Sequence, residues 1–417
     1  MSERETFSNW SGTQTFTPAR ILRPRSVDEL RAIVAEARRV RAVGSAHSFN
    51  RIADTTGDLV SVGGLPREIT IDAAAATVTV TAGIRYGELA VPLQEAGFAL
   101  RNLGSLPHIS IAGACATGTH GSGAGNGALP TSVAALELVT ASGDLVRVAR
   151  GDADFPGMVV ALGALGIVTR VTLDVIPTYD MDQVVYDDLS TSVLLEDLDE
   201  ILASAYSVSV FTDWRPETPN QVWKKSLAGA ISAPPRGADH VHEDRHPIRG
   251  VSAESCTQQR GVPGPWHLRL PHFRLEFTPS SGEEIQTEFL VAAGDAVAAL
   301  RALEPIAGRI AAVLLVSEIR AVAADDLWLS MAYGRDSVAL HFTWVKDADA
   351  VAPVVAAVEE LLAPFGARPH WGKVFSVAPA ELSRLYPRYD DFRRLAASYD
   401  PGGKFRNDFL DTYFPRL

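Results

Sequence analysis

The sequence has little cysteine, no excess of basic residues and no long apolar run. Its two cysteines, Cys115 and Cys256, exclude a disulfide framework and a cysteine metal cluster. Lys and Arg number 38 against 50 Asp and Glu, and this net charge of −12 argues against a nucleic-acid partner. No uncharged apolar run approaches the ~18 residues of a membrane helix, and Met1–Glu5 lacks the basic-then-apolar order of a secretory signal. We therefore expect a cytoplasmic monomer with reduced thiols and no membrane partner.

The chain is long enough for two domains. A length of 417 residues exceeds what one ordinary hydrophobic core supports. A content of 47% hydrophobic and 21% charged residues is typical of a soluble globular protein. Pro177 precedes a change to longer polar strands. We expect one domain over residues 1–177, a second over 178–375, and a C-terminal segment over 376–417 that packs back on the first.

Hydrophobic periodicity predicts both helices and strands. Ser26, followed by Glu29, is a typical helix N-terminal capping pair. Val78 and Val80 alternate with threonines, as in a strand. In the first domain we expect helices from residue 27 and over 86–96, strands over 41–43, 69–71, 77–82 and 165–173, and a hairpin over 133–148. In the second we expect helices over 294–303 and 351–363, strands over 314–322 and 338–344, and a loop over 233–265.

Two segments of small residues suggest a ligand with phosphates. The first is Val43-Gly44-Ser45-Ala46-His47-Ser48-Phe49-Asn50. Small side chains let consecutive backbone N–H groups form a concave anion nest, although a surface turn is the alternative for this segment alone. Residues 104–123 are rich in Gly, Ala, Ser and Thr but include Leu106 and Ile109, which flexible linkers rarely contain. Together the two segments favour a backbone that wraps a flat, polar-edged cofactor.

Three motifs follow one another along the chain. They are G-S-x-H-S-F-N at 44–50, G-S-L-x-x-x-S-x-x-G-x-x-x-T-G-T-H-G at 104–121 and D-P-x-x-x-F-R-N-D-F at 400–409. Over essentially its whole length the chain resembles the vanillyl-alcohol-oxidase (PCMH-type) class of FAD enzymes, and within it the alditol oxidases more than the aldonolactone oxidases. The resemblance implies an α+β fold, with a two-subdomain FAD-binding domain and a substrate domain whose antiparallel β-sheet is flanked by helices.

The resemblance also implies which residues bind FAD. Alditol oxidases carry FAD covalently through its 8α-methyl group, and this role falls on His47. Relatives commonly have Gly where this chain has Ala46, and a positive φ there would strain alanine by ~1 kcal/mol. The other expected FAD contacts are Val43, Gly44, Ser45, Ala46, Ser48, Ser105, Ser110, Gly113, Thr117, Gly118, Thr119, His120, Val168 and His370.

Polar residues interrupt apolar stretches in the second domain. Glu318 and Arg320 are two residues apart in an expected strand, so they share one face, and so do His341 and Thr343. A surface ion pair and a hydrogen-bonded core histidine are the alternatives. The apolar neighbours of Glu318 and Arg320 indicate burial, which is costly for charges that serve no purpose. Lys373 follows a glycine that lets the backbone approach a ligand, although most lysines are solvated.

By the resemblance these residues form a polyol site. Substrate contacts are expected from Ser105, Glu318, Arg320, Thr343 and Lys373, with His341 beside them and His370 facing the flavin. A polyol hydroxyl both donates and accepts hydrogen bonds, so its site must offer both functions. The expected catalytic residues are Arg320, Lys373 and His341: cations stabilise the developing alkoxide, and Lys373 or His341 accepts the proton.

The expected reaction is oxidation of the terminal primary alcohol of an alditol, such as xylitol or sorbitol, to the aldose, with O2 reduced to H2O2. Gly104 leaves room for O2 beside the flavin. The alternatives are an aldonolactone oxidase or dehydrogenase, and a non-catalytic flavin- and carbohydrate-binding protein. A third is a metal-dependent hydrolase that uses His240, His242 and His246, but their Pro-flanked loop favours solvated side chains, and we predict no metal.

Overall fold

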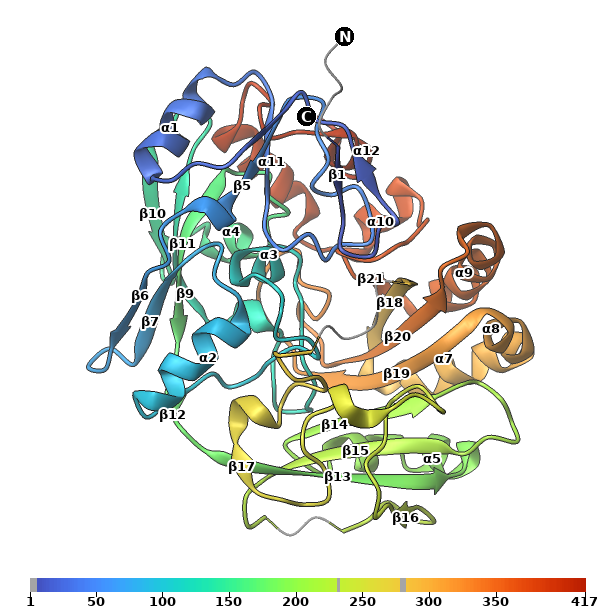
Figure 1. Cartoon of the computed structure of the whole chain (residues 1–417). Helices are drawn as coiled ribbons and strands as arrows, with labels where there is room; N and C mark the ends of the chain where they lie inside the picture. Colours follow the sequence, from blue (N-terminus) through green and yellow to red (C-terminus); the bar gives the residue numbers. More distant parts are fainter. Residues whose placement is uncertain (1–5, 231–232, 278–282) are drawn as a thin grey trace.

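The computed structural model describes residues 6–230, 233–277 and 283–417, so the Met1–Glu5 segment considered above lies outside the described residues. The chain forms two lobes (Figure 1). The blue-to-green lobe contains the N-terminal strands, and the green-to-orange lobe is built on one broad sheet. The red C-terminal helices return to lie beside the blue lobe.

Two sheets form the framework of the first lobe. A parallel sheet has the order β3-β5-β4, and a five-stranded antiparallel sheet has the order β10-β9-β11-β7-β6. Their strands are β3 (Arg20–Leu22), β4 (Val40–Val43), β5 (Asp58–Ser61), β6 (Ile69–Asp72), β7 (Thr77–Thr81), β9 (Val133–Val139), β10 (Leu145–Ala149) and β11 (Ile167–Asp174). Val78 and Val80 of β7 are fully buried, as their alternation predicts. The expected strands and the 133–148 hairpin are confirmed within one or two residues.

Short helices and strand pairs complete this lobe. The helices are α1 (Val27–Glu36), α2 (Tyr86–Glu95), α3 (Ile111–Ala116) and α4 (Phe155–Val159), and the small strand pairs are β1 (Phe7–Ser8) with β2 (Thr15–Phe16) and β8 (Phe98–Ala99) with β12 (Ile176–Pro177). The Ser26 hydroxyl accepts a hydrogen bond from the Glu29 N–H, which confirms the predicted cap of α1.

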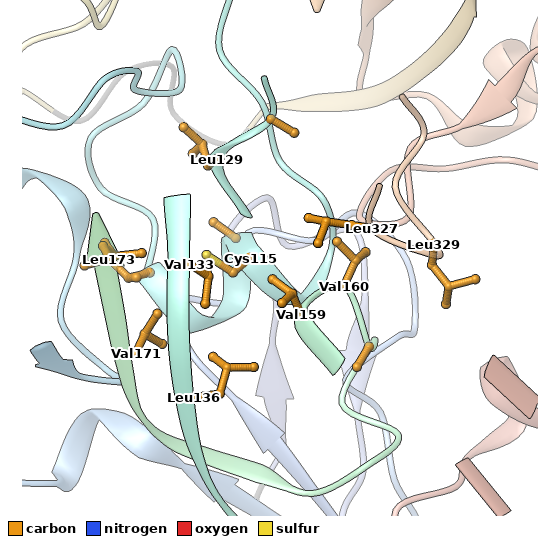
Figure 2. Packing of buried hydrophobic residues seen from close by; sticks show 14 of the residues in the cluster. Cys115, Leu129, Val133, Leu136, Val159, Val160, Val171, Leu173, Leu327 and Leu329 are labelled. Carbon is orange, nitrogen blue, oxygen red and sulfur yellow. The ribbon is translucent and has the colours of Figure 1, made fainter. Parts of the chain in front are cut away.

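The core of the first lobe is shared with the second half of the chain. Figure 2 shows Cys115 packed among apolar side chains of β9, β11 and the segment after α4, with Leu327 and Leu329 beside them. Both cysteines are buried and free. Because residues so distant in sequence belong to one cluster, the relative position of the lobes is fixed by side-chain packing.

One large sheet dominates the second lobe. Its order over the described residues is β16-β13-β15-β14-β19-β20-β18-β21, with β17 also paired to β13. The strands are β13 (Asp180–Leu189), β14 (Ser207–Thr212), β15 (Asn220–Leu227), β16 (Asp239–His240), β17 (Gly264–Pro265), β18 (Glu284–Ala292), β19 (Leu314–Val322), β20 (Ser337–Val345) and β21 (Arg368–Pro369). All pairings between the described strands of this sheet are antiparallel, which confirms the expected sheet.

The two faces of this sheet differ in chemistry. On β19 and β20, Ile319, Leu340, Phe342 and Trp344 pack with helices of the same lobe. These helices are α5 (Thr191–Glu196), α6 (Leu198–Ala203), α7 (Ala296–Leu303), α8 (Ala307–Val313) and α9 (Ala348–Leu362). The alternate residues form the other face, where Glu318 pairs directly with His341 across the strands. The predicted sharing of faces is therefore confirmed, and the polar face looks toward the first lobe.

The C-terminal segment joins the core of the first lobe. Its helices are α10 (Pro379–Leu385), α11 (Tyr389–Tyr399) and α12 (Asp408–Tyr413), and Phe392, Leu410 and Phe414 belong to the same cluster as Val78 and Val80. Sequence periodicity did not lead us to expect these helices, nor α5, α6 and α8. Among the described residues, no helix has both the length and the apolarity needed to cross a membrane.

Candidate active site

A cavity of about 670 Å³ lies between the two loops of the first lobe that we expect to bind the cofactor and the polar face of the large sheet. It is lined by nearly all of the predicted site residues: Val43, Gly44, Ser45, Ala46, His47, Ser48, Ser105, Ser110, Gly113, Thr117, Thr119, His120, Val168, Glu318, Arg320, His341, Thr343, His370 and Lys373. Gly118 is the exception, since it does not line the cavity, and its contact with FAD stays a prediction. It has φ 72°, and a Cβ there would lie 3.2 Å from Met331, so it serves the turn behind the cavity wall.

The His47 loop and the start of α3 hold each other closely. The Ser110 N–H donates to Ser45 Oγ at 3.0 Å, and the Ser45 N–H lies 3.3 Å from Ser110 Oγ. A Cβ on Gly44 would lie 2.1 Å from Ser110 Oγ, so only glycine allows this approach. Ala46 adopts φ 55°, the left-handed conformation that favours glycine. Small side chains and backbone polar groups thus line this end of the cavity, which fits a cofactor with phosphates.

His47 is fixed by an aromatic neighbour. The ring of Trp10 stacks on its imidazole with centroids 5.1 Å apart and an interplanar angle of 17°. The Trp10 N–H also donates to the Ala46 carbonyl at 2.8 Å. Burial lowers the pKa of His47 to about 4, so its ring is neutral and keeps a nucleophilic lone pair at neutral pH. Our sequence analysis missed Trp10, which is far from any cofactor motif.

The His47 loop is bonded directly to the segment that carries Lys373. Asn50 Nδ2 donates to the carbonyl oxygens of Trp371 and Lys373, each at 2.8 Å. The Phe49 N–H donates to the Gly372 carbonyl at 2.7 Å. These bonds fix the expected cofactor attachment point relative to an expected catalytic residue, although the two are more than 300 residues apart in sequence.

A buried carboxylate, Glu288 of β18, lies at the centre of the cationic groups. One of its oxygens is 2.5 Å from Arg320 Nη2, 3.2 Å from His120 Nε2 and 3.6 Å from His341 Nδ1, and the other is 3.8 Å from Lys373 Nζ. Burial works to raise the pKa of Glu288, but His120, Arg320 and Lys373 outweigh it and hold that pKa well below its usual range. Glu288 is therefore an anion that partly neutralises the charges of Arg320 and Lys373.

Lys373 and His341 form the other half of this group. Lys373 Nζ donates to Gln286 Oε1 and lies 3.3 Å from His341 Nδ1. Because an ammonium only donates, Nδ1 accepts, and Nε2 carries the hydrogen that faces Thr343 Oγ1 at 3.2 Å. Burial is the main cause that lowers the pKa of Lys373 to about 8 and that of His341 to about 4. Lys373 therefore titrates near physiological pH, whereas His341 stays neutral.

Arg320 connects the charged group to the cofactor segment. Its Nη1 is 3.3 Å from Ser105 Oγ, and its Nε is 3.5 Å from Glu318 Oε2. The buried Glu318 also accepts a 2.8 Å hydrogen bond from His272. Burial works to raise the pKa of Glu318, but Arg320 and His272 hold it below its usual range. Opposite charges and hydroxyl groups are thus held together in a site largely closed to water.

His370 lies on the cofactor side of this group. Its Nδ1 accepts from the Gly372 backbone N–H at 3.0 Å, and the backbone N–H of His370 donates to the Glu288 carbonyl at 2.9 Å. Burial lowers the pKa of His370 well below its usual range, so the ring is neutral. Its centroid is 6.0 Å from that of His120. Both imidazoles line the cavity, as expected for residues near a flavin.

Sequence reasoning missed several residues of the site. Glu288 and Gln286 alternate on β18, which is adjacent to β20, and His272 and Lys225 lie behind Glu318. The E-I-Q-T-E pattern at 284–288 has the same period of two that revealed Glu318 and Arg320. That period was the available signal; the interspersed Thr287 made the stretch less apolar than its neighbours.

The histidine tract considered as a metal site is dispersed. His240 lies in the edge strand β16 opposite Tyr186, with its ring 4.9 Å from that of His242. His246 instead lines the large cavity, and its Nδ1 accepts from the Ile248 N–H at 3.0 Å. Within the described residues no group of three or more His, Cys, Asp or Glu is arranged to hold a metal ion.

Comparison with known proteins agrees with this geometry. The family described as FAD binding domain matches residues 18–149, and the family described as D-arabinono-1,4-lactone oxidase matches residues 283–413. The chain is 49% identical to an alditol oxidase of a Streptomyces species over 406 residues, or 97% of each protein. It is 30% identical to an L-gulono-1,4-lactone dehydrogenase of Mycobacterium tuberculosis, again over 97% of each.

A solved structure supports the fold. The crystal structure of cholesterol oxidase from B. sterolicum matches with a TM-score of 0.78 at 15% identity, covering 98% of this chain and 96% of the other. The fold and the cavity thus define an FAD-dependent oxidoreductase with a PCMH-type fold. The chain belongs to the vanillyl-alcohol-oxidase family of FAD-dependent oxidases, in the branch that contains the alditol oxidases.

Proposed function

We propose that the protein oxidises the terminal primary alcohol of an alditol, such as xylitol or sorbitol, to the aldose with O2 as electron acceptor. The observation that carries the proposal is the convergence of Arg320, Lys373 and Glu318 on the wall of the cavity that the His47 loop also lines. The alditol oxidase relative, matched over nearly its whole length, supports the same choice of substrate.

The side chains suit alcohol oxidation. Glu318 accepts hydrogen bonds from substrate hydroxyls, and Arg320 donates to them, which orients the open chain. Lys373 in its neutral form accepts the proton of the reacting hydroxyl, and Arg320 stabilises the negative charge that develops on its oxygen. Bound FAD supplies the hydride acceptor and, through O2, the route to H2O2. Because Glu318 and Arg320 are buried, their charges act with little screening by water.

We also propose that FAD is attached to His47. The ring is neutral, is held by Trp10 and faces the cavity beside the Ser45 and Ser110 contact. The use of O2 is supported by Gly104, where an added Cβ would come into ordinary van der Waals contact at 3.7 Å, so the glycine leaves a methyl-sized space there. Attachment and O2 use are separate parts of the proposal, and each has its own measurement below.

An aldonolactone oxidase is the second candidate. The D-arabinono-1,4-lactone oxidase family match over residues 283–413 favours it, because that region contains β18, β19, β20 and Lys373. The paired donor and acceptor groups of Arg320 and Glu318 favour an open-chain polyol with several hydroxyls. A lactone presents a ring ester that offers fewer hydrogens to the carboxylate.

Anaerobic mixing tests the choice. Purified yellow protein is mixed with xylitol, sorbitol, L-gulono-1,4-lactone or D-arabinono-1,4-lactone, and flavin absorbance is followed by stopped flow. Faster bleaching by the alditols supports the proposal. Faster bleaching by a lactone supports the second candidate, and absorbance that persists with every compound indicates a binding protein without this activity.

We further propose a cytoplasmic monomer. The burial of both free cysteines agrees with a reducing compartment, because neither thiol is presented for pairing. Light scattering during size-exclusion chromatography tests the monomer, and cell fractionation tests the location.

A further inference from the structure

A chain of buried polar groups extends away from the cavity behind Glu318. His272 lies next to Glu318, and Lys225 of β15 lies next to His272. Lys225 is only 1% exposed and His272 only 5%. A lysine is seldom buried to this degree unless its charge has fixed partners, so the arrangement requires an explanation.

The hydrogens of this chain have fixed positions. Lys225 Nζ lies 2.5 Å from the Leu270 carbonyl, 3.0 Å from the Pro271 carbonyl and 3.1 Å from His272 Nδ1. Burial lowers the pKa of Lys225 to about 7. In its protonated form the amine has three hydrogens and no acceptor, so all three are donated and Nδ1 holds a lone pair. The hydrogen of the neutral His272 ring is therefore on Nε2.

His272 Nε2 points at the substrate site. It lies 2.8 Å from Glu318 Oε1, with Ser209 Oγ at 3.4 Å. Burial and Lys225 together lower the pKa of His272 to about 4, so the ring stays neutral and Nε2–H donates to the carboxylate. This bond engages one oxygen of Glu318 and sets the rotation of its carboxylate about the side chain.

The other oxygen of Glu318 faces an unused donor. Glu318 Oε2 is 3.5 Å from Arg320 Nε, and Nε makes no hydrogen bond to any residue that the structure describes. The other nitrogens of Arg320 are directed to Glu288 and Ser105. A single hydroxyl can satisfy both groups, since it accepts from Nε–H and donates to the carboxylate. Free rotation of the carboxylate would instead let Oε2 shorten this 3.5 Å ion pair into a direct hydrogen bond with Nε–H.

We propose that Lys225 and His272 are positioning residues that keep the Glu318 carboxylate out of direct hydrogen-bond contact with Arg320 Nε and so keep a paired donor and acceptor for one substrate hydroxyl. The inference rests on the proposed function and deepens it. Substrate recognition then depends on a hydroxyl that donates a hydrogen bond, whereas a ring ester oxygen has no hydrogen to donate. Neither residue takes part in the chemical step.

Two substitutions of His272 separate its hydrogen bonds from its packing. The ring packs edge-to-face with Phe211 and Trp223, each with centroids 5.4 Å apart. His272→Phe keeps an aromatic ring there but removes the donor to Glu318. His272→Gln supplies an amide that accepts from Lys225 and donates to Glu318. Lys225→Met removes the charge behind the histidine, and Lys224→Met on the same strand is its control, since Lys224 contacts the Ala233 carbonyl instead.

The measurement is anaerobic flavin reduction by xylitol, which yields an apparent Kd and a limiting rate. We expect His272→Phe and Lys225→Met to raise the apparent Kd about tenfold to hundredfold, as for a lost hydrogen bond to a charged group. The limiting rate should fall less, and His272→Gln should recover most of the affinity. Lys224→Met should behave as the unmodified protein.

Several outcomes would overturn the inference. An unchanged apparent Kd in His272→Phe does so, and so does an equal loss in His272→Phe and His272→Gln, because packing alone then explains the effect. If Lys225→Met does not fold, as judged by its melting curve, the His272 pair decides. Failure of every alditol to reduce the unmodified protein is a different result, which rejects the proposed function itself.

Discussion

The Glu288 carboxylate lies 2.5 Å from the Arg320 guanidinium, although β20 separates the strands that carry them. The residue opposite Arg320 on β20 is Ala339, and the residue opposite Glu288 is His341. The short side chain of Ala339 leaves the long Arg320 side chain room to cross the intervening strand. Three strands thus contribute to one cluster of charged side chains. Replacing a charged residue on any of them changes the pKa values of the groups on the others.

Glu288→Gln tests this coupling. The Glu288 charge raises the pKa of Lys373 against the effect of burial, so its loss lowers that pKa further below about 8. We expect turnover to fall at least about tenfold, because Arg320 and Lys373 are left without a buried counterion, and the alkaline rise of kcat/KM to move to lower pH. Steady-state kinetics over pH 5 to about 10 measures both effects. Glu283→Gln, at a largely exposed neighbour, should leave the profile unchanged; an unshifted profile in Glu288→Gln contradicts the coupling.

The pH dependence identifies the proton acceptor. If neutral Lys373 accepts the proton, kcat/KM rises with pH through about 8, where its pKa lies. If His341 accepts it, the rise is complete near its pKa of about 4 and the rate is flat above pH 6. We expect the rise near 8, and we expect Lys373→Met to abolish it while lowering turnover at least about tenfold. A flat profile in the unmodified protein would assign the proton to His341.

The charged face shows how far sequence patterns reach. Glu318, Arg320, His341 and Thr343 could be placed on one face because each lies in an apolar strand with a period of two. The same period did not reveal Glu288, since polar residues occupy both faces of β18 at this point. Which strands lie side by side is decided by long-range packing, and no local pattern specifies it.

The helices show a similar limit. The capped, amphipathic α1 and α9 were predicted, whereas α11 was missed although Tyr389, Phe392 and Leu395 form one buried face. Its other positions are so rich in Asp and Arg that the apolar face is narrow. The helix is stabilised mainly by the packing of this face against the first lobe. The resemblance to known FAD enzymes supplied the expected cofactor residues, but the Trp10 stack on His47 became apparent only in the structure.

If FAD is attached as proposed, its covalent binding should depend on His47 and be assisted by Trp10. His47→Ala should abolish flavin fluorescence of the protein band on a denaturing gel, whatever FAD it binds in the native state. Trp10→Ala should lower the covalently bound fraction several-fold, because the ring loses its stacking partner, and Trp10→Phe should retain most of it. The measurement is the ratio of fluorescence to protein stain. A fluorescent His47→Ala band would refute the attachment, and full fluorescence in Trp10→Ala would refute the role of the stack.

The methyl-sized space at Gly104 should control reoxidation by O2. An added methyl group has contacts of 3.7 Å or more, so Gly104→Ala fits, whereas the branches of Gly104→Val fill the space toward Ile109 and Thr119. We expect Gly104→Val to slow reoxidation of the reduced flavin about tenfold or more and to change its reduction by xylitol much less. Stopped-flow mixing of reduced protein with oxygenated buffer measures this step. Reoxidation at the original rate would show that O2 reaches the flavin by another side.

Ala46→Gly should stabilise the protein. Ala46 has φ 55°, a conformation that costs an alanine about 1 kcal/mol relative to glycine. We therefore expect the free energy of unfolding, measured by chemical denaturation, to rise by up to ~1 kcal/mol, less the larger backbone entropy that glycine has when unfolded. Ala76→Gly is a matched control, because Ala76 has φ 50° in an exposed turn away from the cavity. A gain at Ala76 with a loss at Ala46 would show that the Ala46 methyl group contributes packing that outweighs its strain. A gain at both, with an unchanged covalent FAD fraction, would show that the strain is tolerated by the loop and is not needed for attachment at His47.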